Sequence, residues 1–417
     1  MANLSGNKGE WSEIYIFLKL MTDGKIYAAD RNMKKLENIF LNIVKIIREE
    51  VLSQKYEYYT GKQIKIFLNG EEIAPLVDVT EFDKYQNLLW EKLTSTTKGN
   101  GIVCEDVERF LNSIHVTKLK APAFSSSNFF GGTEDISMEV MDYRNGINSI
   151  IGFSCKSDFS AKSTLFNASA DNTNFVFEVI GNVNDELMNK FNSIFNYKSK
   201  KNKETGVNEL KTEIAIGNRM RYLKEKGCDL QYQKMCVDNA ERNLVLSGGL
   251  EMPLIVANML KVYYFEGEGK FETSSLLYAL EKVVEENVAG YGFDNTESMY
   301  YRKLGTLLYD MFTGMRLSRA WDGRSSVNGG YIIAKNDGEV LAYHSCMADE
   351  FKDFLIKQLG FESPSATRHK YMKIYKENNK YYLKLNLQVR FKGNGTSSDE
   401  RLLNRLLPYI QGITNSR

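Results

Sequence analysis

An Asn-Gly dipeptide at residues 145–146, set between two runs of alternating apolar and polar residues, constrains this chain more than any other feature. Asn-Gly favours a two-residue type I′ turn, because both turn positions need positive φ. The flanking runs, residues 135–140 and 149–156, are therefore predicted to pair as an antiparallel hairpin. Centring the turn on the dipeptide places Arg144 opposite Ile147 and fixes the register of the strands.

This register predicts which side chains share a face. Directly opposed residues point to the same side of a sheet, so Asp135 is expected opposite Lys156 and Ser137 opposite Ser154. One face then carries the polar residues Asp135, Ser137, Ser154 and Lys156. The other carries the apolar residues Ile136, Met138, Val140, Phe153 and Cys155. A one-residue slip would bury the charged set, so the alternation supports the register.

An aspartate and a lysine on adjacent strands resemble the catalytic arrangement of the PD-(D/E)xK nucleases. In that arrangement an Asp binds Mg²⁺, and the next strand supplies a second ligand followed two residues later by a Lys. The metal polarises the scissile phosphate, and the lysine positions the nucleophile. Hard oxygen ligands such as Asp135 suit Mg²⁺. The pair Asp135 and Lys156 is equally compatible with an ordinary cross-strand ion pair.

Two positions depart from that pattern. Ser154 stands where the second acid is usual, and Glu134 stands where a proline is usual. A third carboxylate must then come from elsewhere. At a rise of about 3.4 Å per residue, Asp142 lies roughly 24 Å along the strand from Asp135 and is expected to be a turn residue. Glu139 lies about 14 Å away by the same rise.

The N-terminal segment offers a better third carboxylate. Glu10 and Glu13 are three residues apart on a predicted helix and share one of its faces. Glu13 is expected to complete the metal site from this helix. The alternative is that both acids belong to a solvated helix face.

Composition narrows the remaining classes. The chain has 417 residues, enough for two or three domains, and 43% of them are hydrophobic. With 54 Lys and Arg against 53 Asp and Glu, any DNA-binding surface must come from local segregation of charge. The GxSxG, P-loop and HExxH motifs are absent, which argues against serine hydrolases, P-loop nucleotide enzymes and zinc proteases.

The cysteines and the apolar segments favour a soluble cytoplasmic protein. The five cysteines form no CxxC pair, which is typical of reduced thiols and argues against a zinc site; they are Cys104, Cys155, Cys228, Cys236 and Cys346. The longest apolar stretch, residues 39–47, is too short to span a bilayer. No signal peptide is expected at the N-terminus.

Three consecutive regions are expected along the chain. Residues 1–120 are predicted to be mainly helical, from apolar spacing at Trp11, Ile14 and Leu18 and again at Leu36, Ile39, Ile43 and Ile46. Residues 121–260 would form the nuclease core, with a further strand at 175–180. Residues 261–417 would form a mixed C-terminal region that contributes DNA recognition.

Shorter segments within this plan are also predicted. Helices are expected over residues 238–269 and 274–288, and hairpins over 330–344 and 370–391. The first hairpin would turn at Asn336-Asp337-Gly338 and the second at Asn378-Asn379. The basic stretch 198–206 is predicted to be a solvated loop, with phosphate contact as the alternative.

Blocks spread over nearly the whole chain resemble, in order, the HpaII family of type II restriction endonucleases. They include residues 7–13, 14–20 and 23–29 near the start, and 135–136, 152–157, 164–169 and 173–175 in the centre. The C-terminal blocks are 321–323, 328–333, 337–340, 343–344, 365–369 and 385–391. The segment after Lys156, residues 158–162, matches the family less well.

The resemblance implies an α/β fold with a PD-(D/E)xK-like core and a mixed sheet. It also implies cleavage of double-stranded DNA, with Mg²⁺ as cofactor and a cognate methyltransferase protecting the host. The family's type member recognises CCGG. In this chain Asp135 and Glu13 would bind the metal, Lys156 would position the attacking water, and Ser154 would take the second-ligand position. A homodimer on DNA is an open possibility.

Sequence-specific cleavage requires residues that read bases, and arginine binds guanine bidentately in the major groove. The candidates are Arg324, Arg368, His369, Gln388 and Arg390, with Asn167 and Asn174 as phosphate or minor-groove contacts. Gln388 and Arg390 are two residues apart and are expected to share a strand face. Each basic residue is also compatible with a phosphate contact or a surface charge.

Two rival functions stay open. Ser154 and the missing proline are compatible with a catalytically inactive DNA-binding protein of the same fold, which would bind specific DNA in Ca²⁺ without cutting it in Mg²⁺. An unrelated protein with a chance Asp–Lys hairpin would show no salt-dependent DNA binding.

Overall fold

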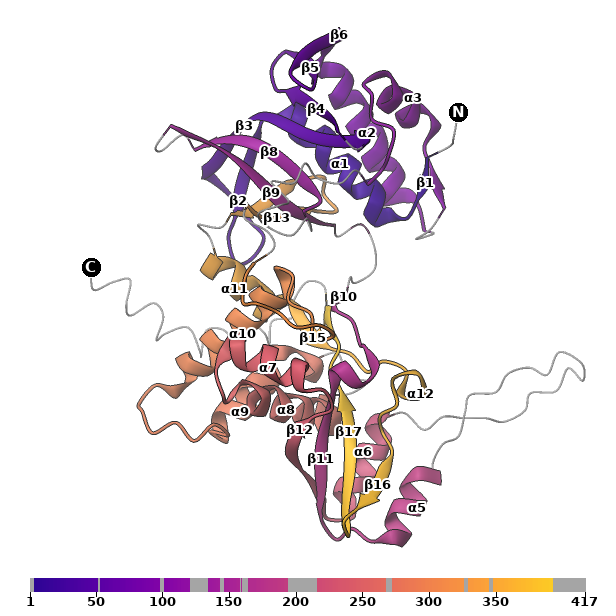
Figure 1. Cartoon of the computed structure of the whole chain (residues 1–417), viewed down its shortest axis with the longest axis vertical. Helices are drawn as coiled ribbons and strands as arrows, with labels where there is room; N and C mark the ends of the chain where they lie inside the picture. The colour runs from indigo at the N-terminus through magenta and orange to yellow at the C-terminus, as the bar shows by residue number, and fades with distance from the viewer. Residues whose placement is uncertain are drawn as a thin grey trace, which may run out of the picture. The chain divides into compact units, whose positions relative to one another are not determined.

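The computed structural model describes residues 4–51, 53–97, 101–120, 134–142, 146–157, 159, 164–193, 216–267, 272–325, 329–344 and 348–392. The chain divides into two compact units, which Figure 1 shows in full. Unit 1 consists of Met1–Ser163 and Ser325–Phe354, and unit 2 of Thr164–Arg324 and Leu355–Arg417. These discontinuous units differ from the three consecutive regions expected at 1–120, 121–260 and 261–417.

Unit 1 is built on one mixed sheet with the strand order β2-β14-β13-β9-β8-β3-β4-β5-β6. The strands are β2 (Lys25–Ala29), β3 (Lys35–Val51), β4 (Gln54–Tyr59), β5 (Gln63–Leu68), β6 (Glu71–Asp78), β8 (Ile136–Asp142), β9 (Ile147–Ser157), β13 (Gly330–Ala334) and β14 (Val340–His344). Since β2 also pairs with β3, the strands from β2 to β3 in this order close into a ring. The pairs β13–β9 and β14–β2 are parallel and the others antiparallel, so the expected mixed sheet is confirmed.

Helix α1 (Lys8–Asp23) lies in the core of unit 1. Asn7 caps its N-terminus in a capping box with Glu10, and Gly24 ends it at φ 62°. Its apolar side chains share one buried cluster with Met138 and Phe153 of the sheet. Helix α2 (Val79–Ser95) packs against α1, and α3 (Glu105–Ser113) against α2. The short strands β1 (Ser5–Gly6) and β7 (Ile102–Val103) pair with each other.

The prediction of a mainly helical N-terminal region is wrong between α1 and α2, where the chain forms the strands β2 to β6. The residues read as a second helix, Leu36, Ile39, Ile43 and Ile46, lie on β3, a strand of 17 residues. Ile43 and Ile46 are both buried although three residues apart, because the pairing with β8 shifts register between Ile43 and Lys45. A bulge of this kind changes which side the following residues face, so a strand can imitate helical spacing.

The predicted hairpin exists as β8 and β9, but its register differs by two residues. Ile136 pairs with Phe153 and Asp142 with Ile147, which brings Asp135 level with Ser154 rather than Lys156. The connection is longer than two residues: Gly146, at φ 69°, donates its N–H to the Asp142 carbonyl at 2.7 Å, and Asn145 lies outside the described residues. Asp142 is therefore the last residue of β8.

A shift of two residues keeps every side chain on its predicted face. The apolar set is buried in the core as expected: Ile136, Met138, Val140, Phe153 and Cys155. The predicted faces are thus confirmed even though the partners across the hairpin change.

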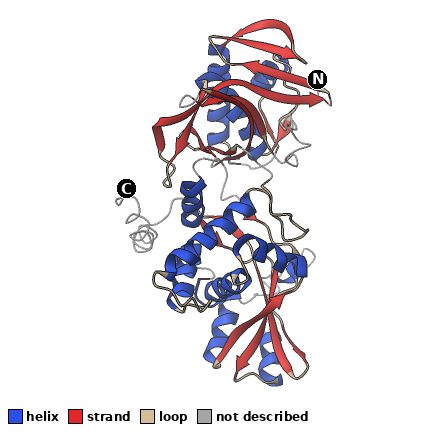
Figure 2. Ribbon diagram, turned by 60° about the vertical axis from the view of Figure 1, so that its left-hand side comes forward, coloured by secondary structure: helices blue, strands red, loops and turns tan. Residues whose placement is uncertain are grey.

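Unit 2 contains two smaller sheets, ordered β12-β11-β17-β16 and β10-β18-β15. Their strands are β10 (Thr164–Phe166), β11 (Asn174–Gly181), β12 (Cys228–Met235), β15 (Leu359–Phe361), β16 (Ile374–Glu377), β17 (Lys380–Asn386) and β18 (Val389–Phe391). Figure 2, coloured by secondary structure, shows the long strands lying beside helices.

The helices of unit 2 are α5 (Asp185–Ser193), α6 (Ile216–Glu225), α7 (Asp238–Gly248), α8 (Met252–Val262), η2 (Tyr263–Gly267), η3 (Glu272–Ser274), α9 (Leu276–Glu285), α10 (Thr296–Phe312) and α12 (Ala366–His369), with η1 (Ala170–Thr173). Along α11 (Ala348–Gln358) the chain passes from unit 1 to unit 2. The helix expected over 238–269 breaks between α7 and α8, where Gly249 adopts φ 89°.

Both C-terminal hairpins are confirmed. Strands β13 and β14 pair around Gly338, which has φ 90°. Strands β16 and β17 turn at Asn378 and Asn379, both in the left-handed region. The second hairpin ends at Asn386, however, and residues 389–391 join another sheet as β18. The basic stretch 198–206 lies outside the described residues.

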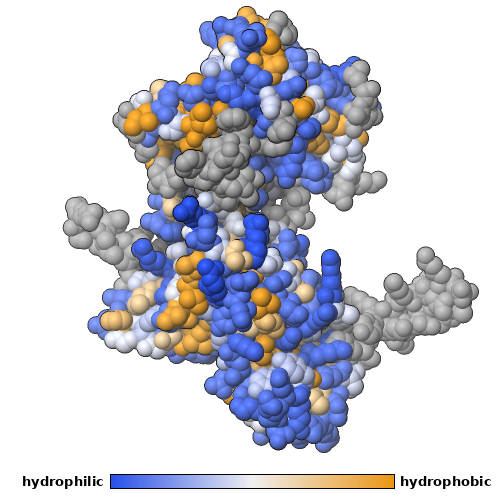
Figure 3. All heavy atoms as spheres, viewed as in Figure 1, coloured by the Kyte–Doolittle hydropathy of each residue, from blue (hydrophilic) through white to orange (hydrophobic). Residues whose placement is uncertain are grey.

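On the face shown in Figure 3, hydrophilic residues cover most of the described surface. Within the described part of the chain, no single helix is long and apolar enough to cross a membrane. Only the pair Asp238–Gly248 and Met252–Gly267, bent by 104° at its break, reaches that length and composition together. Cys104, Cys155, Cys228 and Cys236 are free thiols, and Cys346 lies outside the described residues.

Candidate active site

The carboxylate of Asp135 is fixed at the start of β8. Its backbone N–H donates to the Phe153 carbonyl at 2.9 Å, which ties the residue to β9. Its Oδ2 accepts two hydrogen bonds of 2.8 Å, from the Ser154 hydroxyl and from the Cys155 N–H. Ser154 therefore acts on the Asp135 carboxylate itself. Among the described residues no hydrogen bond is donated to Oδ1, which leaves that oxygen available to a ligand.

The side chain of Glu13, on α1, lies near the Asp135 carboxylate, and these two acids mark the candidate active-site corner. The Glu13 side chain is only 12% exposed. Burial, and then the nearby charge of Asp135, raise the pKa of Glu13 to about 7 against the opposing effect of Lys120 and Lys156. The Asp135 carboxylate thus disfavours ionisation of Glu13. The structure brings Glu13 and Asp135 together as the sequence analysis expected.

Glu10 has a different role from Glu13. Its carboxylate accepts the Asn7 N–H at 2.8 Å, and its own N–H donates to the Asn7 side chain at 3.0 Å. This capping box holds the first turn of α1. The motif was legible in the sequence as an Asn followed three residues later by a Glu.

Two lysines surround the carboxylates. Lys156 follows Ser154 by two residues on β9 and lies near enough for its charge to lower the pKa of Glu13. Lys120 approaches Glu13 to 3.5 Å. The charges of Glu13 and Asp135 raise the pKa of Lys120, so this lysine stays protonated. Lys120 was not a predicted site residue, and no spacing or motif around it gives a signal.

A buried ion pair anchors the segment that carries Lys120. Glu50, 1% exposed, accepts the N–H groups of Thr117 and Lys118 at 2.9 and 3.1 Å. Arg48 donates to Glu50 at 2.7 Å and to the Lys118 carbonyl at 2.8 Å. The backbone just before Lys120 is therefore fixed to the far end of β3.

Glu13, Lys120 and Lys156 line a pocket of about 230 Å³. Its lining residues are Asn7, Gly9, Glu10, Ser12, Glu13, Ile16, Lys120, Cys155, Lys156 and Ser157. The Ser12 and Ser157 hydroxyls are joined at 2.9 Å, which links α1 to the end of β9. Burial, with the charges of Asp135 and Glu13, raises the pKa of the Cys155 thiol well above its usual range, so this cysteine is not a nucleophile.

The carboxylates of Glu13 and Asp135 are hard oxygen donors, the kind of ligand that Mg²⁺ takes. The described residues contain no group of three or more His, Cys, Asp or Glu side chains placed to hold a metal ion. Mg²⁺ needs fewer protein ligands, since it is commonly held by one or two carboxylates and completes its shell with water and substrate phosphate. Glu13 and Asp135 supply two such carboxylates.

The predicted DNA-reading residues all fall in unit 2. Arg324 is 85% exposed, with Asp322 at 3.9 Å. Arg368 on α12 and Asn167 after β10 are exposed. Gln388 and Arg390 both donate to the carboxylate of Glu362 at 2.7 Å.

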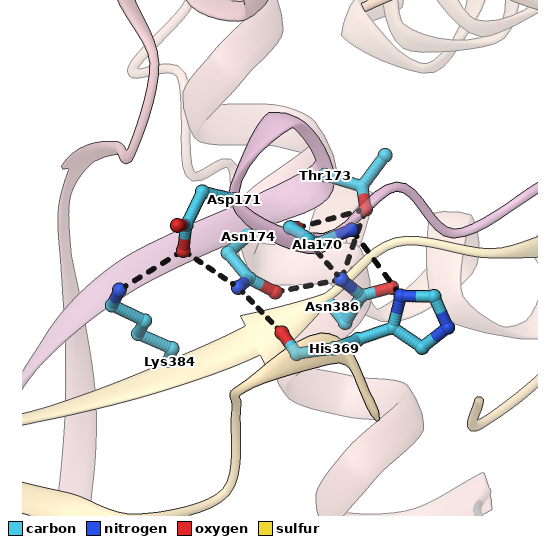
Figure 4. A network of polar contacts seen from close by, with 7 residues as sticks. All are labelled: Ala170, Asp171, Thr173, Asn174, His369, Lys384 and Asn386. Carbon is cyan, nitrogen blue, oxygen red and sulfur yellow. Dashed lines mark hydrogen bonds and ion pairs between the residues drawn. The ribbon is translucent and has the colours of Figure 1, made fainter. Parts of the chain in front are cut away.

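Asn174 and His369 belong instead to an internal polar network, drawn in Figure 4. Asn174 is completely buried, and its amide donates to the His369 carbonyl at 3.0 Å and accepts from Asn386 at 2.6 Å. The His369 Nδ1 accepts the Ala170 N–H at 3.2 Å. Burial removes the Asn174 side chain from any ligand, which argues against the predicted contact with DNA.

Most of the chain matches a known family. The model of the HpaII restriction endonuclease family aligns with residues 7–391, so the chain belongs to this family of nucleases. It is 30% identical over 396 residues to the type II restriction enzyme HpaII of Haemophilus parainfluenzae, covering 93% of this chain and 98% of that enzyme. No solved structure matches the chain.

Proposed function

We propose that this chain is a Mg²⁺-dependent type II restriction endonuclease that hydrolyses double-stranded DNA at a short, CCGG-like site. The observation that carries the proposal is the Asp135 carboxylate, fixed by Ser154 and Cys155 beside the buried Glu13 and the two lysines. The match to an enzyme named HpaII supports the CCGG-like specificity. The PD-(D/E)xK core is part of the same proposal.

Each residue has a defined task in this reaction. Asp135 and Glu13 would hold Mg²⁺ through carboxylate oxygens, and Ser154 keeps the Asp135 carboxylate in place by its hydrogen bond of 2.8 Å. When bound there, Mg²⁺ would supply Lewis-acid polarisation of the scissile phosphate and a more acidic water. Lys156 orients the attacking water and offsets the charge that develops on the phosphate.

The second lysine, Lys120, keeps the pocket from carrying two uncompensated negative charges before the metal arrives. In-line attack of water on phosphorus breaks the bond to the 3′ oxygen. The products are a 5′-phosphate and a 3′-hydroxyl.

The biological setting follows from this activity. A cognate methyltransferase would protect the host's own sites, and both proteins would work in the cytoplasm where the DNA is. Cutting two strands favours two copies of the chain on one site. Sedimentation with and without a duplex carrying the mapped site tests this. Two copies of the chain on the duplex are expected, and a single copy on it would contradict the idea.

The decisive experiment is digestion of unmethylated phage DNA in Mg²⁺ by wild type, Asp135→Ala, Lys156→Ala and Asp142→Asn. Discrete fragments from wild type and Asp142→Asn, lost in the other two, are expected. Asp142 is the matched control because it is the last residue of β8, the strand that follows Asp135. Fragments that survive Asp135→Ala would move the metal to another carboxylate.

Ser154 in place of an acid also motivates a second candidate, an inactive DNA-binding protein of the same fold. That protein would bind specific DNA in Ca²⁺ and leave it intact in Mg²⁺. Wild type that binds without cutting would therefore replace the nuclease proposal with this one.

A further inference from the structure

Glu362 lies between two of the predicted DNA-reading side chains. Its Oε1 accepts from Nη1 of Arg390 at 2.7 Å, and its Oε2 accepts from Nε2 of Gln388 at 2.7 Å. A third contact of 3.4 Å runs from Nε of Arg390 to the hydroxyl of Thr164. One carboxylate and one hydroxyl therefore fix the orientation of the guanidinium group.

The backbone around Glu362, Arg390 and Thr164 is also held by strand pairing. Arg390 on β18 pairs with Thr164 of β10 on one side and with Gly360 of β15 on the other. Just beyond that sheet, the Glu362 N–H donates to the Gln388 carbonyl at 3.1 Å. One small sheet thus holds Thr164 beside Glu362 and Arg390, although Thr164 lies about 200 residues before them in the sequence.

The contacts leave part of the guanidinium available to a ligand. They use Nε and Nη1, and Nη2 donates to no residue in the described part of the chain. The Arg390 side chain is 37% exposed and that of Glu362 is 35% exposed. A planar guanidinium whose rotation is already restricted loses little entropy when it binds a planar acceptor pair.

Neighbouring residues on the same segments provide suitable surroundings. Arg368 on α12, six residues after Glu362, is exposed, and so is Asn167, three residues after Thr164. Helix α12 contacts η1, which continues from the segment of Asn167. Such side chains are common contacts to phosphate and sugar, which orient a duplex without reading it.

We infer that Glu362 is a positioning residue that holds Arg390 for bidentate contact with the major-groove edge of one guanine in the recognition sequence. Gln388 fixes the other oxygen of Glu362 and so stops the carboxylate from rotating. The fork of arginine matches the O6 and N7 acceptors of guanine, the commonest specific contact in the major groove. The inference rests on the proposed cleavage of specific DNA.

An ordinary surface ion pair would have a simpler form. Asp185 in the same unit also has two partners, Lys376 at 3.0 Å and the Tyr381 hydroxyl at 2.9 Å. Lys376 is a flexible point charge and has no fork. Asp185→Asn is therefore the matched control for Glu362→Gln, because each change removes one carboxylate charge from a doubly bonded acid.

The test uses the full-length protein and duplexes that carry the mapped site. Each guanine is replaced in turn by 7-deazaguanine, which lacks the N7 acceptor, and kcat/KM for cleavage is measured. For wild type and Asp185→Asn, one guanine position is expected to lower kcat/KM roughly tenfold or more. Arg390→Lys, which keeps the charge but loses the fork, should show a clearly smaller penalty for 7-deazaguanine at that position.

Glu362→Gln should lower kcat/KM on the unmodified site and reduce the penalty at the same position, with urea unfolding unchanged. A purely structural ion pair would change unfolding and leave the pattern of penalties intact. Penalties on kcat/KM in Glu362→Gln or Arg390→Lys that equal those of wild type would overturn the inference. So would a wild type whose cleavage is unaffected by 7-deazaguanine at every position. Either result would leave the proposed nuclease activity standing. A wild type that cuts no DNA would remove the proposed function and the inference with it.

Discussion

The candidate active-site corner of unit 1 and the asparagine network of unit 2 treat buried polar groups differently. In the network the side-chain N–H groups of Asn386 meet acceptors, Thr173 at 2.9 Å and Asn174 at 2.6 Å, although its own Oδ1 has no hydrogen-bond partner in the described part of the chain. At the corner, Glu13 is buried near another carboxylate, and its pKa rises to about 7. Hydrogen bonds within the fold thus stabilise the network, whereas the surroundings of the buried acid at the corner disfavour its charge.

The strongest test of this contrast is Glu13→Gln. The amide keeps the shape of the side chain but cannot supply the anionic oxygen that a Mg²⁺ site requires. Cleavage of the mapped site is expected to fall by about 10²–10³-fold, in line with the loss of one strong electrostatic contact to a transition state. Single-turnover cleavage measures the effect. Activity within a fewfold of wild type would show that Glu13 is only a buried acid.

The same residue makes a prediction about stability and pH without metal. An acid whose folded pKa is raised from 4.5 to about 7 destabilises the fold once it must ionise, so stability falls as pH rises between these values. The loss is about 3 kcal/mol at pH 8, from the interval between 4.5 and about 7 at 1.36 kcal/mol per pH unit. Urea unfolding in EDTA should show this slope in wild type and not in Glu13→Gln.

Added Mg²⁺ should recover much of that stability in wild type and little in the variant. A variant that is less stable than wild type at pH 8 in EDTA would contradict the idea that Glu13 is held at a cost to the fold.

In the network, Asn386→Ala should act on stability and not on chemistry. Asn386 is completely buried, and its loss leaves the Asn174 carbonyl oxygen without its donor. The expected destabilisation is about 2 kcal/mol, since a buried polar group that loses its partner costs about 1–3 kcal/mol. Urea unfolding measures it, and cleavage well below the unfolding temperature should stay near wild type. A large loss of kcat in a folded variant would mean that the network serves catalysis.

The smallest expected effect is the pH response of His369. Burial and the charge of Arg368 lower the pKa of His369 below 6.5, and its Nδ1 accepts the Ala170 N–H only when unprotonated. Its contribution to stability is therefore complete above pH 6.5 and is lost as pH falls through that value to the lower pKa of the folded state. His369→Gln should flatten this part of the unfolding profile. An identical profile in the variant would assign the response to other groups.

The hairpins were predictable from the sequence where the turn residues, asparagine or glycine, favour the positive φ that the turn needs. Asn378-Asn379 and Gly338 mark turns that need positive φ, and both hairpins form where expected. The faces of the β8–β9 hairpin were also predictable, because alternation survives a shift of two residues. Its exact partners were not, since the length of the connection after Asp142 is not fixed by a single Asn-Gly pair.

The errors have equally specific causes. Strand β3 resembled a helix because a bulge near Ile43 places residues three apart on the same side. Lys120 and Glu362 escaped notice because their roles depend on partners more than 20 residues away, Glu13 for one and Arg390 for the other. Asn174 was predicted to contact DNA because only the fold shows that its amide is buried against Asn386 and His369.

The closed ring of strands in unit 1 has a consequence for the order of synthesis. The first 163 residues supply β2, β3, β8 and β9, but the ring closes only when β13 and β14, from residues 330–344, pair with β9 and β2. A chain still emerging from the ribosome therefore exposes two unpaired strand edges, one of them on the β9 strand of the candidate active site, until most of it has been translated. For a protein whose premature activity would endanger the genome of its own host, the topology itself delays the moment at which the enzyme becomes competent.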